Sequence, residues 1–291
     1  MTTSPEAQEI VIITGASTGV GAATARELAR QGFHVLAGVR RDQDADAIRG
    51  PGVEPLIIDI TNPAQIRALA TRVQEDPQGR PLRALINNAG VAVNAPVEVF
   101  SINEWRSLFE VNFFGHIAVT QALLPALIRS RGRIINISSV GGKIAMATYG
   151  PYGSTKFALE AVSDSLRREI APLGVQVVVV EPGAVRTAIG DKAIDKAQKL
   201  ALTMRPEQRE HYSGLMHAIT AQVESAMKSA LPAEAAARVI AKAVTARKPR
   251  TRYTVGLQTA IMTRLVRILP DKMLDFLLAA VLRPLFPKES K

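Results

Sequence analysis

The chain has 291 residues and no cysteine, which excludes disulfide bonds, thiol catalysis and cysteine-based metal sites. Its net charge is +10, but residues 1–227 carry 23 basic and 22 acidic side chains, whereas residues 228–291 carry 13 and 4. The excess charge therefore belongs to the C-terminal segment, and without a recognisable binding motif it does not predict a nucleic-acid partner. The four histidines lack the spacing of a metal site, so no metal is expected.

The N-terminal residues give no sign of a targeting segment. Residues 1–9 are polar, include Pro5 and Glu6, and lack the basic and apolar regions of a signal peptide. No stretch reaches the roughly 18 uninterrupted apolar residues that a membrane span needs. The cytoplasm is therefore the expected location.

Short apolar runs alternate with amphipathic stretches along most of the chain. The runs are rich in valine and isoleucine and are the expected strands: 10–13, 35–39, 56–58, 82–86, 133–137 and 175–180. The stretches between them are the expected helices: 20–31, 63–75, 104–130 and 152–173, with Asn62-Pro63 as a typical helix start. This alternation predicts an α/β fold, a doubly wound parallel sheet with helices on both faces, in one domain over residues 1–291.

The regular alternation weakens after Pro182. Residues 187–230 contain only helix-like sequence, and we expect this insertion to form a wall of a substrate pocket. A seventh strand is expected at 252–255. It precedes a basic helical extension, residues 257–291, with helices near 259–269 and 271–282.

A glycine-rich segment follows the first strand and opens the first helix. It has the sequence Thr14-Gly15-Ala16-Ser17-Thr18-Gly19-Val20-Gly21. Glycines in this position permit a tight turn and let the backbone approach a pyrophosphate, while the helix N-terminus favours its negative charge. Three residues, and not one, separate the first two glycines, and the Gly-Lys-Ser/Thr ending of a Walker loop is missing. The segment predicts a dinucleotide site.

Tyr152 and Lys156 are spaced to lie on one face of a helix, and Ser139 lies thirteen residues before Tyr152 at a strand end. A phenol has a pKa of about 10, too high for acid–base catalysis at neutral pH. A nearby ammonium stabilises the phenolate and lowers that pKa. The three residues together could donate a proton to a carbonyl, although by itself the Tyr152/Lys156 pair could equally be an exposed helix pair.

Taken together, the motifs resemble the short-chain dehydrogenase/reductase family. They are Thr14-Gly15-x-x-x-Gly19-x-Gly21, Asn87-Asn88-Ala89-Gly90, Asn112, Ser139, Tyr152-x-x-x-Lys156 and Pro182-Gly183, and the resemblance covers about residues 8–190. It implies a Rossmann-like cofactor-binding and catalytic core and an oxidoreductase that interconverts an alcohol with a ketone or aldehyde. The segments 139–142 and 252–256 most resemble the hydroxysteroid and retinol dehydrogenase branch.

The resemblance implies a role for each of four catalytic residues. Tyr152 would transfer the proton to or from the substrate oxygen, and Lys156 would lower its pKa and bind the nicotinamide ribose. Ser139 would orient the substrate oxygen and stabilise its developing charge. Asn112 would hold a water that leads protons from Lys156 to solvent.

Two neighbouring residues compete for these assignments. Ser138 is an alternative to Ser139, but the thirteen-residue spacing to Tyr152 favours Ser139. Tyr149 is an alternative to Tyr152, but no lysine follows it at four residues.

The second strand ends in Arg40 and Arg41, where an acidic residue would bind both ribose hydroxyls of NAD. Because arginine pairs with a 2′-phosphate, NADP(H) is the expected cofactor, with NAD(H) as the alternative given the nearby Asp42 and Asp44. The other residues expected to contact the cofactor are Gly15, Ser17, Thr18, Gly19, Val20 and Gly21 at the pyrophosphate, Asp59 and Ile60 at the adenine, Asn88, Ala89 and Gly90 beside the adenosine ribose, and Pro182, Gly183, Val185 and Thr187 at the nicotinamide, together with Tyr152 and Lys156.

The expected substrate is a small lipophilic alcohol or carbonyl compound, steroid-like or retinoid-like. Its predicted contacts are Ser139, Val140, Met146, Tyr149 and Tyr152, with Met204, Met216, Leu200, Leu202 and Leu215 of the insertion region as further candidates. Methionine and leucine adapt to bulky apolar ligands, although most such residues belong to an ordinary core. A non-catalytic dinucleotide-binding sensor or scaffold is the alternative function, but such a protein has no need of all four catalytic residues.

The resemblance also implies a homodimer or homotetramer that assembles through the two long helices, 104–130 and 152–173. Phe109, Phe113 and Phe157 are the candidate interface residues. We expect the basic C-terminal helices to pack over the pocket or against another subunit, and peripheral contact with a membrane is the alternative.

Overall fold

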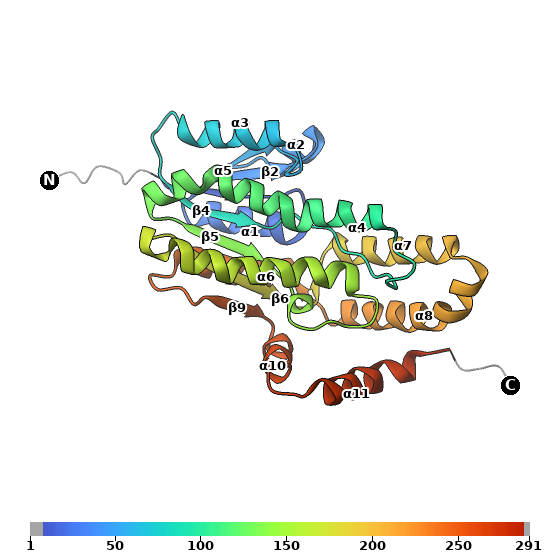
Figure 1. The fold of residues 1–291 in the computed structure, drawn as a ribbon. Coiled ribbons are helices and arrows are strands. Elements are labelled where there is room, and N and C mark those ends of the chain that lie inside the picture. The colour runs from blue at the N-terminus through green and yellow to red at the C-terminus, as the bar shows by residue number, and fades with distance from the viewer. Residues whose placement is uncertain (1–7, 288–291) are drawn as a thin grey trace.

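A computed structural model describes residues 8–287 as a sheet with helices on both faces (Figure 1). The strands of this sheet are β1 (Ile10–Ile13), β2 (His34–Val39), β3 (Val53–Ile57), β4 (Leu82–Asn87), β5 (Arg133–Ile137), β6 (Gln176–Pro182) and β9 (Arg252–Val255). They lie in the order β3-β2-β1-β4-β5-β6-β9, and all neighbours pair in parallel. The predicted doubly wound parallel sheet is confirmed.

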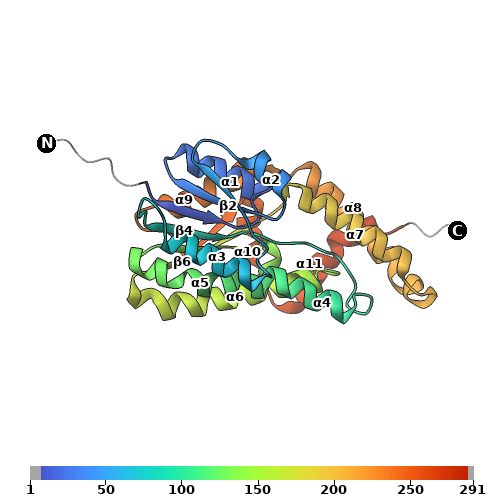
Figure 2. The same ribbon diagram turned by 90° about the horizontal axis from the view of Figure 1, so that it is seen from above.

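Helices cover the sheet in two layers (Figure 2). One layer holds α1 (Gly19–Arg30), α2 (Asp42–Ile48) and α9 (Ala233–Thr245), and the other holds α3 (Pro63–Gln74), α5 (Gly115–Ser130) and α6 (Gly150–Ile170). Alternate residues of β1 face opposite layers: Val11 and Ile13 belong to the core beneath α1, whereas Ile10 and Ile12 belong to the core beneath α5. Burial on both faces explains why the strands read as unbroken apolar runs.

Two elements differ from the expectation for physical reasons. The strand β3 begins at Val53 and not at residue 56, because Glu54 and Pro55 interrupt its apolar pattern. Proline is tolerated there because β3 lies at the sheet edge. The helices α2 and α9 were not predicted, although α9 is rich in alanine, the residue with the highest helix propensity.

The predicted helix 104–130 consists of three segments. It runs through α4 (Ile102–Phe109), a π-helical turn (Glu110–Phe114) and α5. By length and composition, residues 102–130 are apolar enough to cross a membrane, but 39% of the most apolar window is buried within this fold. Phe109 and Phe113 are half-buried, so the exposed phenylalanine of this helix is Phe114.

The insertion is a helical hairpin of α7 (Ala188–Thr203) and α8 (Pro206–Lys228). Two short strands, β7 (Val185–Arg186) and β8 (Leu231–Pro232), pair in parallel at its base. Met204 and Met216 are buried against each other and Ala197, and Leu202 is 82% exposed. These three residues were expected to line a pocket. Instead, the two methionines are buried in the core of the hairpin, and Leu202 is exposed to solvent.

The C-terminal extension consists of α10 (Leu257–Leu265) and α11 (Asp271–Leu282), followed by a 3-10 turn (Arg283–Leu285). Thr259 of α10 packs against Gly183 at the end of β6. Leu282 of α11 packs against Ala218 and Ile219 of α8, where the predicted pocket residue Leu215 also lies. The predictions for the N-terminal segment and for the end of the C-terminal extension concern residues 1–7 and 288–291, which lie outside the described residues.

Candidate active site

The predicted site residues gather at the carboxyl edge of the parallel sheet. Thr14 follows β1, Asn88 follows β4, Ser139 follows β5 by two residues, and Gly183 follows β6. Parallel strands place their carboxyl ends at one edge, which is where doubly wound folds bind ligands. The sheet therefore brings motifs that are up to 170 residues apart in the chain to a common edge.

Asn112 joins two segments of this edge. It lies in the π-helical turn, a local geometry that occurs mainly at functional sites, and its side chain is fully buried. Its Oδ1 accepts a hydrogen bond from the Val91 amide at 2.9 Å, and its Nδ2 donates to the Val91 carbonyl at 2.8 Å and to Thr155 Oγ1 at 3.2 Å. Because Thr155 precedes Lys156, Asn112 fixes the catalytic helix against the end of β4.

Tyr152 and Lys156 lie one turn apart on α6, as predicted. The Lys156 ammonium lies 5.8 Å from the Tyr152 ring centroid and donates to the Ile137 carbonyl at 2.9 Å. A Cβ atom at Gly90 would lie 3.4 Å from Asn112 Oδ1 and 3.9 Å from Lys156 Nζ. The side chains of Asn112 and Lys156 therefore both lie beside Gly90.

The pKa values of Tyr152 and Lys156 do not follow the expectation. Burial raises the pKa of Tyr152 to about 12, and contact with the Ser139 side chain opposes this rise. Burial also lowers the pKa of Lys156 to about 8, against the pull of Glu160. The lysine was expected to lower the phenol pKa, but its ammonium is held by the Ile137 carbonyl and desolvation dominates. At neutral pH Tyr152 is therefore a protonated phenol.

Ser139 and Tyr152 face the same small space. A Cβ atom at Gly141 would lie 3.2 Å from the Tyr149 ring and 3.4 Å from the Tyr152 ring, and Ser139 Oγ accepts from the Gly141 amide at 3.1 Å. The two tyrosine rings meet edge to face with centroids 5.9 Å apart. Ser138 is instead buried behind this turn, with its hydroxyl facing Gly142. This geometry favours Ser139 over Ser138.

The other predicted substrate contacts lie in the same loop. Val140 follows Ser139 and opens a 3-10 turn (Val140–Gly142), and Met146 accepts a backbone hydrogen bond from Tyr149 at 3.0 Å. Val140 and Met146 are both half-buried. The loop between β5 and α6 therefore holds all five of the predicted substrate residues, or borders them.

The glycine-rich segment packs directly on the end of β4. Gly15 has a φ of +67°, and a Cβ atom there would lie 2.7 Å from the Ala89 Cα. Thr14 Oγ1 accepts from the Asn88 and Ala89 amides, each at 3.0 Å. Only glycine permits this approach. Ser17, Thr18, Gly19 and Val20 form the exposed or half-buried turn into α1, and Thr18 gives the helix no side-chain cap. The uncapped N-terminus suits a phosphate group.

The two arginines after β2 are not equivalent. Arg41 pairs with Asp44 through two contacts, at 2.7 Å and 2.8 Å, and this pairing lowers the pKa of the Asp44 carboxyl. Arg40 is exposed and makes no hydrogen bond or ion pair with its side chain among residues 8–287. The contact of Arg40 and Arg41 with a 2′-phosphate stays a prediction, and Arg40 is the one of the two without a side-chain partner among residues 8–287.

The two residues predicted at the adenine have structural roles as well. Asp59 Oδ1 accepts from the amide and the hydroxyl of Thr61, at 2.9 Å and 2.7 Å, which lowers its pKa. The side chain of Ile60 is buried beneath Gly115. Only the backbone of Ile60 and the outer carboxylate oxygen of Asp59 remain for a ligand.

The turn after β6 closes the site on the side of the phosphate loop. Pro182 ends the strand, Val185 lies in β7, and Thr187 precedes α7. A Cβ atom at Gly19 would lie 2.9 Å from Thr187 Cγ2. The predicted nicotinamide and pyrophosphate segments therefore touch each other.

A buried ionic network behind the site was missed by the sequence analysis. Lys143, in the loop after Ser139, binds Glu160 at 2.6 Å, and Arg252 of β9 contacts Glu160 at 3.1 Å and Glu181 at 3.3 Å. Glu160 lies one turn after Lys156 on α6. The network holds the serine loop, the catalytic helix and two strands together. These residues are too far apart in the chain for any spacing pattern to reveal them.

Two further residues near the site escaped notice. His116 lies one turn after Asn112 and is fully buried, and burial, with a contribution from Lys156, lowers its pKa to about 3. It is therefore neutral at physiological pH. Thr148, next to Tyr149, has a φ of +62°, a left-handed conformation that is costly for a β-branched residue.

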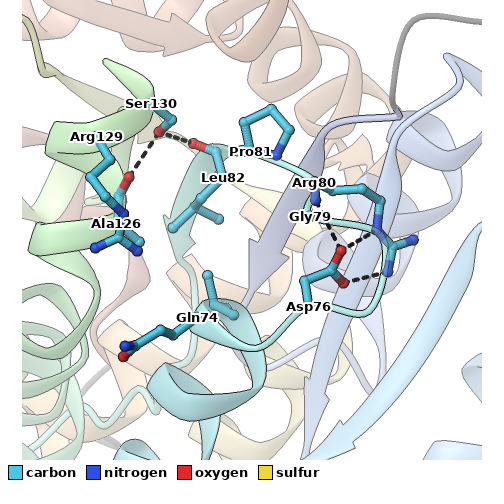
Figure 3. A pocket seen from close by; sticks show the side chains of 10 residues that line it. Gln74, Asp76, Gly79, Arg80, Pro81, Leu82, Ala126, Arg129 and Ser130 are labelled. Atoms are coloured by element: carbon cyan, nitrogen blue, oxygen red, sulfur yellow. Dashed lines mark hydrogen bonds and ion pairs between the residues drawn. The ribbon is translucent and has the colours of Figure 1, made fainter.

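The surface hollow shown in Figure 3 does not belong to this site. It measures about 240 Å³ and lies at the start of β4, at the opposite edge of the sheet. Its carboxylate, Asp76, pairs with Arg80 at 2.6 Å and with Arg72 at 2.9 Å, and these guanidinium groups hold the pKa of Asp76 well below its usual range. This fully paired carboxylate fastens α3 to the following loop.

Comparison with known proteins agrees with the geometry. Residues 9–198 match the family model described as short chain dehydrogenase. The chain belongs to the short-chain dehydrogenase family. It is 34% identical to human "Retinol dehydrogenase 5" over 96% of this chain and 90% of that protein. It is 33% identical to the "NADPH-dependent 3-dehydrocapnine reductase" of Ornithobacterium rhinotracheale over 91% of this chain and 94% of that protein.

A solved short-chain dehydrogenase from Burkholderia cenocepacia, in complex with NADP, superposes with a TM-score of 0.71 at 25% identity, covering 97% of this chain and 99% of that one. The family and the resemblance to the retinol dehydrogenase branch are therefore confirmed. As a member of this family the protein is an oxidoreductase that acts on CH–OH groups.

Proposed function

We propose that this dehydrogenase uses NADP(H) to interconvert a lipophilic alcohol and its aldehyde or ketone, with Tyr152 as the acid–base group. The observation that carries the proposal is the convergence of Ser139, Tyr152 and Lys156 at the carboxyl edge of the sheet, with Lys156 close to Gly90 and Tyr152 close to Gly141.

The residues at this edge fit a dinucleotide. The backbone of Gly15 approaches Ala89 too closely for any side chain, and the start of α1 offers uncapped amides for a pyrophosphate. Arg40, whose side chain has no partner in the described part of the chain, suits a 2′-phosphate. NADPH in the name of one relative and NADP in one neighbour's complex support the same cofactor. When bound, the nicotinamide supplies or accepts the hydride.

The protein's own residues would handle the proton. In the reducing direction the protonated phenol of Tyr152 donates to the carbonyl oxygen, while Ser139 donates a hydrogen bond that stabilises the developing charge. Lys156, whose pKa is about 8, exchanges protons near physiological pH. The Ile137 carbonyl accepts a hydrogen bond directly from Lys156. Asn112 binds the neighbouring residue, Thr155, and so helps to position the lysine.

Apolar side chains near Tyr152 support a lipophilic substrate. A Cβ atom at Gly150 would lie 3.1 Å from Val97 Cγ2, and Val97 is 68% exposed. Trp105 and Leu200 pack together on a small core that also contains Phe100. These side chains come from the loop after β4, from α4 and from α7. The name of the retinol dehydrogenase relative agrees with an apolar substrate.

The first test is Tyr152→Phe, assayed by NADPH oxidation with a panel of ketones and aldehydes. Losing the phenol hydroxyl should lower kcat by about a thousandfold, because general acid–base catalysis contributes on this scale. NADPH binding, followed by fluorescence titration, should be unchanged. Substantial residual turnover would show that another group is the acid. Binding of NADPH by the wild type without turnover of any carbonyl would favour a sensor or scaffold.

The second test concerns the substrate. The wild type should reduce decanal with a higher kcat/KM than propanal, and Val97→Asp should narrow this difference by placing a charge at the rim. Equal kcat/KM for the two aldehydes would refute the lipophilic assignment without touching the assignment of Tyr152.

A further inference from the structure

The helix α11 has an apolar side that no described residue covers. Met273, Phe276, Leu277 and Val281 recur at intervals of three and four, so they form one stripe along the helix. Phe276 is 70% exposed and Val281 61% exposed. Only Leu282 of this helix is buried, where the helix meets α8. An exposed apolar stripe of this kind is typical of an interaction surface.

The helix α10 presents a second stripe of the same kind. Leu257, Ile261 and Leu265 are spaced four residues apart, and Ile268 follows in the connection to α11. Leu257 is 78% exposed and Ile268 76% exposed, whereas Thr259 and Thr263 on another side of α10 are buried. We call these two stripes the C-terminal apolar surface. In the extension, α10 buries Thr259 and Thr263 and α11 buries Leu282, while most of the other large apolar residues are exposed. Figure 1 shows the two helices at the margin of the molecule.

Basic side chains flank the C-terminal apolar surface. Arg264, Arg267, Lys272 and Arg283 are exposed and form no salt bridge with any residue of the described chain, 8–287. Lys272 of α11 and Arg283, which caps this helix, lie about a quarter turn from the centre of the apolar stripe, and the acidic residues of α11 lie about half a turn away. This arrangement is typical of a helix that lies in an anionic interface.

We propose that the C-terminal apolar surface docks on a bilayer that contains anionic phospholipids. The charge pattern favours lipid over a second copy of the chain, because a symmetric dimer through this surface would bring its own unpaired cations close together. At twelve residues, α11 is too short to span the roughly 30 Å hydrocarbon core, so it would lie in the interface plane. The apolar stripes enter the lipid boundary while the flanking cations meet phosphate groups.

Docking there would bring the site close to the lipid. Thr259 of α10 packs on Gly183, the turn assigned to the nicotinamide. A lipophilic substrate could then reach Tyr152 from the bilayer without crossing bulk water. The entry of substrate from the bilayer rests on the proposed function, whereas the docking itself does not.

The test is flotation of the full-length protein on phosphatidylcholine vesicles with and without phosphatidylglycerol. The wild type should float with the anionic vesicles, and rising salt should weaken the binding. Two variants address the two parts of the surface: Phe276→Ser with Leu277→Ser, and Lys272→Glu with Arg283→Glu. Each pair should lower the partition coefficient by at least about tenfold. The matched control is Leu202→Ser, which removes an exposed leucine of α7 and should bind like the wild type.

Light scattering and NADPH binding accompany every variant. Unchanged NADPH binding shows that the variant is folded, and it separates a failure of docking from a failure of the proposed function. Absence of flotation on anionic vesicles overturns the proposal. Conversion of an oligomer to a monomer by the Phe276/Leu277 change, without vesicle binding by the wild type, would show that the surface is a subunit interface. Equal binding of the wild type and all variants to the anionic vesicles would also overturn the docking proposal.

Discussion

Lys156 carries a charge although it is only 4% exposed, so the burial of its ammonium lowers the stability of the folded protein. Its pKa falls from 10.5 to about 8 because burial disfavours the ammonium. Lys156→Met keeps the length of the side chain and removes the charge. We expect the variant to be inactive and, at pH 7, more stable than the wild type by about 2 kcal/mol, after allowance for the lost hydrogen bond to Ile137. Urea unfolding, followed by the fluorescence of the single Trp105, measures this difference.

The pH dependence of this difference has a definite sign. Below pH 8 both the folded and unfolded states keep the lysine protonated, so the cost is fully present. Between about 8 and 10.5 the unfolded state binds more protons, and wild-type stability rises with pH. The advantage of Lys156→Met should shrink over that window. A variant that is less stable at pH 7 and keeps a constant difference would contradict the buried-charge cost.

Arg40 and Arg41 are adjacent, but only Arg40 has no partner among the described residues. Arg40→Ala should raise KM for NADPH by about 10- to 100-fold, the value of a charge-assisted contact to phosphate, and leave KM for NADH unchanged. Arg41→Ala should have a much smaller effect, because its guanidinium is already bound to Asp44. Steady-state kinetics with both cofactors decide the matter. An equal rise of both KM values in the Arg40 variant would assign this residue a structural role.

At the scale of residues, the sequence predicts which side chains come together at the site. It does not predict which of them are paired, buried or hydrogen-bonded. The positions of Asn112, Ser139, Tyr152 and Lys156 follow from short motifs on elements whose ends meet at one sheet edge. The pairing of Arg41 with Asp44 and the burial of Ile60 do not follow, because both depend on side-chain packing. Likewise, only the folded structure reveals that the Ile137 carbonyl holds the Lys156 ammonium.

At the scale of elements, two arginines of the sheet hold the end of α9: Arg83 of β4 donates to the Val244 carbonyl, and the buried Arg133 makes the larger number of bonds. Arg133 of β5 donates to the carbonyls of Ala243, Val244 and Ala246, which have no further helical turn to bind them. Arg133→Met should therefore lower the free energy of unfolding by about 3 kcal/mol, since it leaves buried carbonyls unpaired. Urea unfolding measures the loss.

The control for this variant is Arg30→Met, which removes an exposed arginine that pairs with Glu27 on the surface of α1. Surface ion pairs contribute little, so the change should stay within about 0.5 kcal/mol. Similar losses for the two variants would mean that Arg133 does not hold the helix end.

The accuracy of the predicted elements follows their apolar patterns. The bounds of β1, β5, β9 and α11 are predicted to the residue, and of these β1 is an uninterrupted apolar run. By contrast, β3 is shifted where Glu54 binds Arg72 and His34, a use of a strand carboxylate that no local pattern shows. The π-helical turn is likewise invisible in the sequence, since it arises where the long helix adapts to Asn112.

At the scale of the whole molecule, α5 and α6 lie side by side and present an outer face (Figure 2). Phe114, just before α5, and Phe157, in α6, are 51% and 43% exposed. We expect this face to form the subunit contact, so Phe114→Ser with Phe157→Ser should convert the oligomer to monomers in light scattering. Phe276→Ser, on the C-terminal apolar surface, should not change the mass. A monomeric wild type, or an unchanged oligomer in the double variant, would refute this interface.

The pairing of β7 with β8 gives the helical hairpin a further property. The chain leaves the catalytic core at Val185 and returns at Leu231, and these two residues are partners in the same short ladder. The hairpin between them therefore starts and finishes at one point of the body. Its length and sequence can change during evolution while Ser139, Tyr152 and Lys156 keep their places. New substrate preferences can thus arise by replacement of one module, without a redesign of the chemistry.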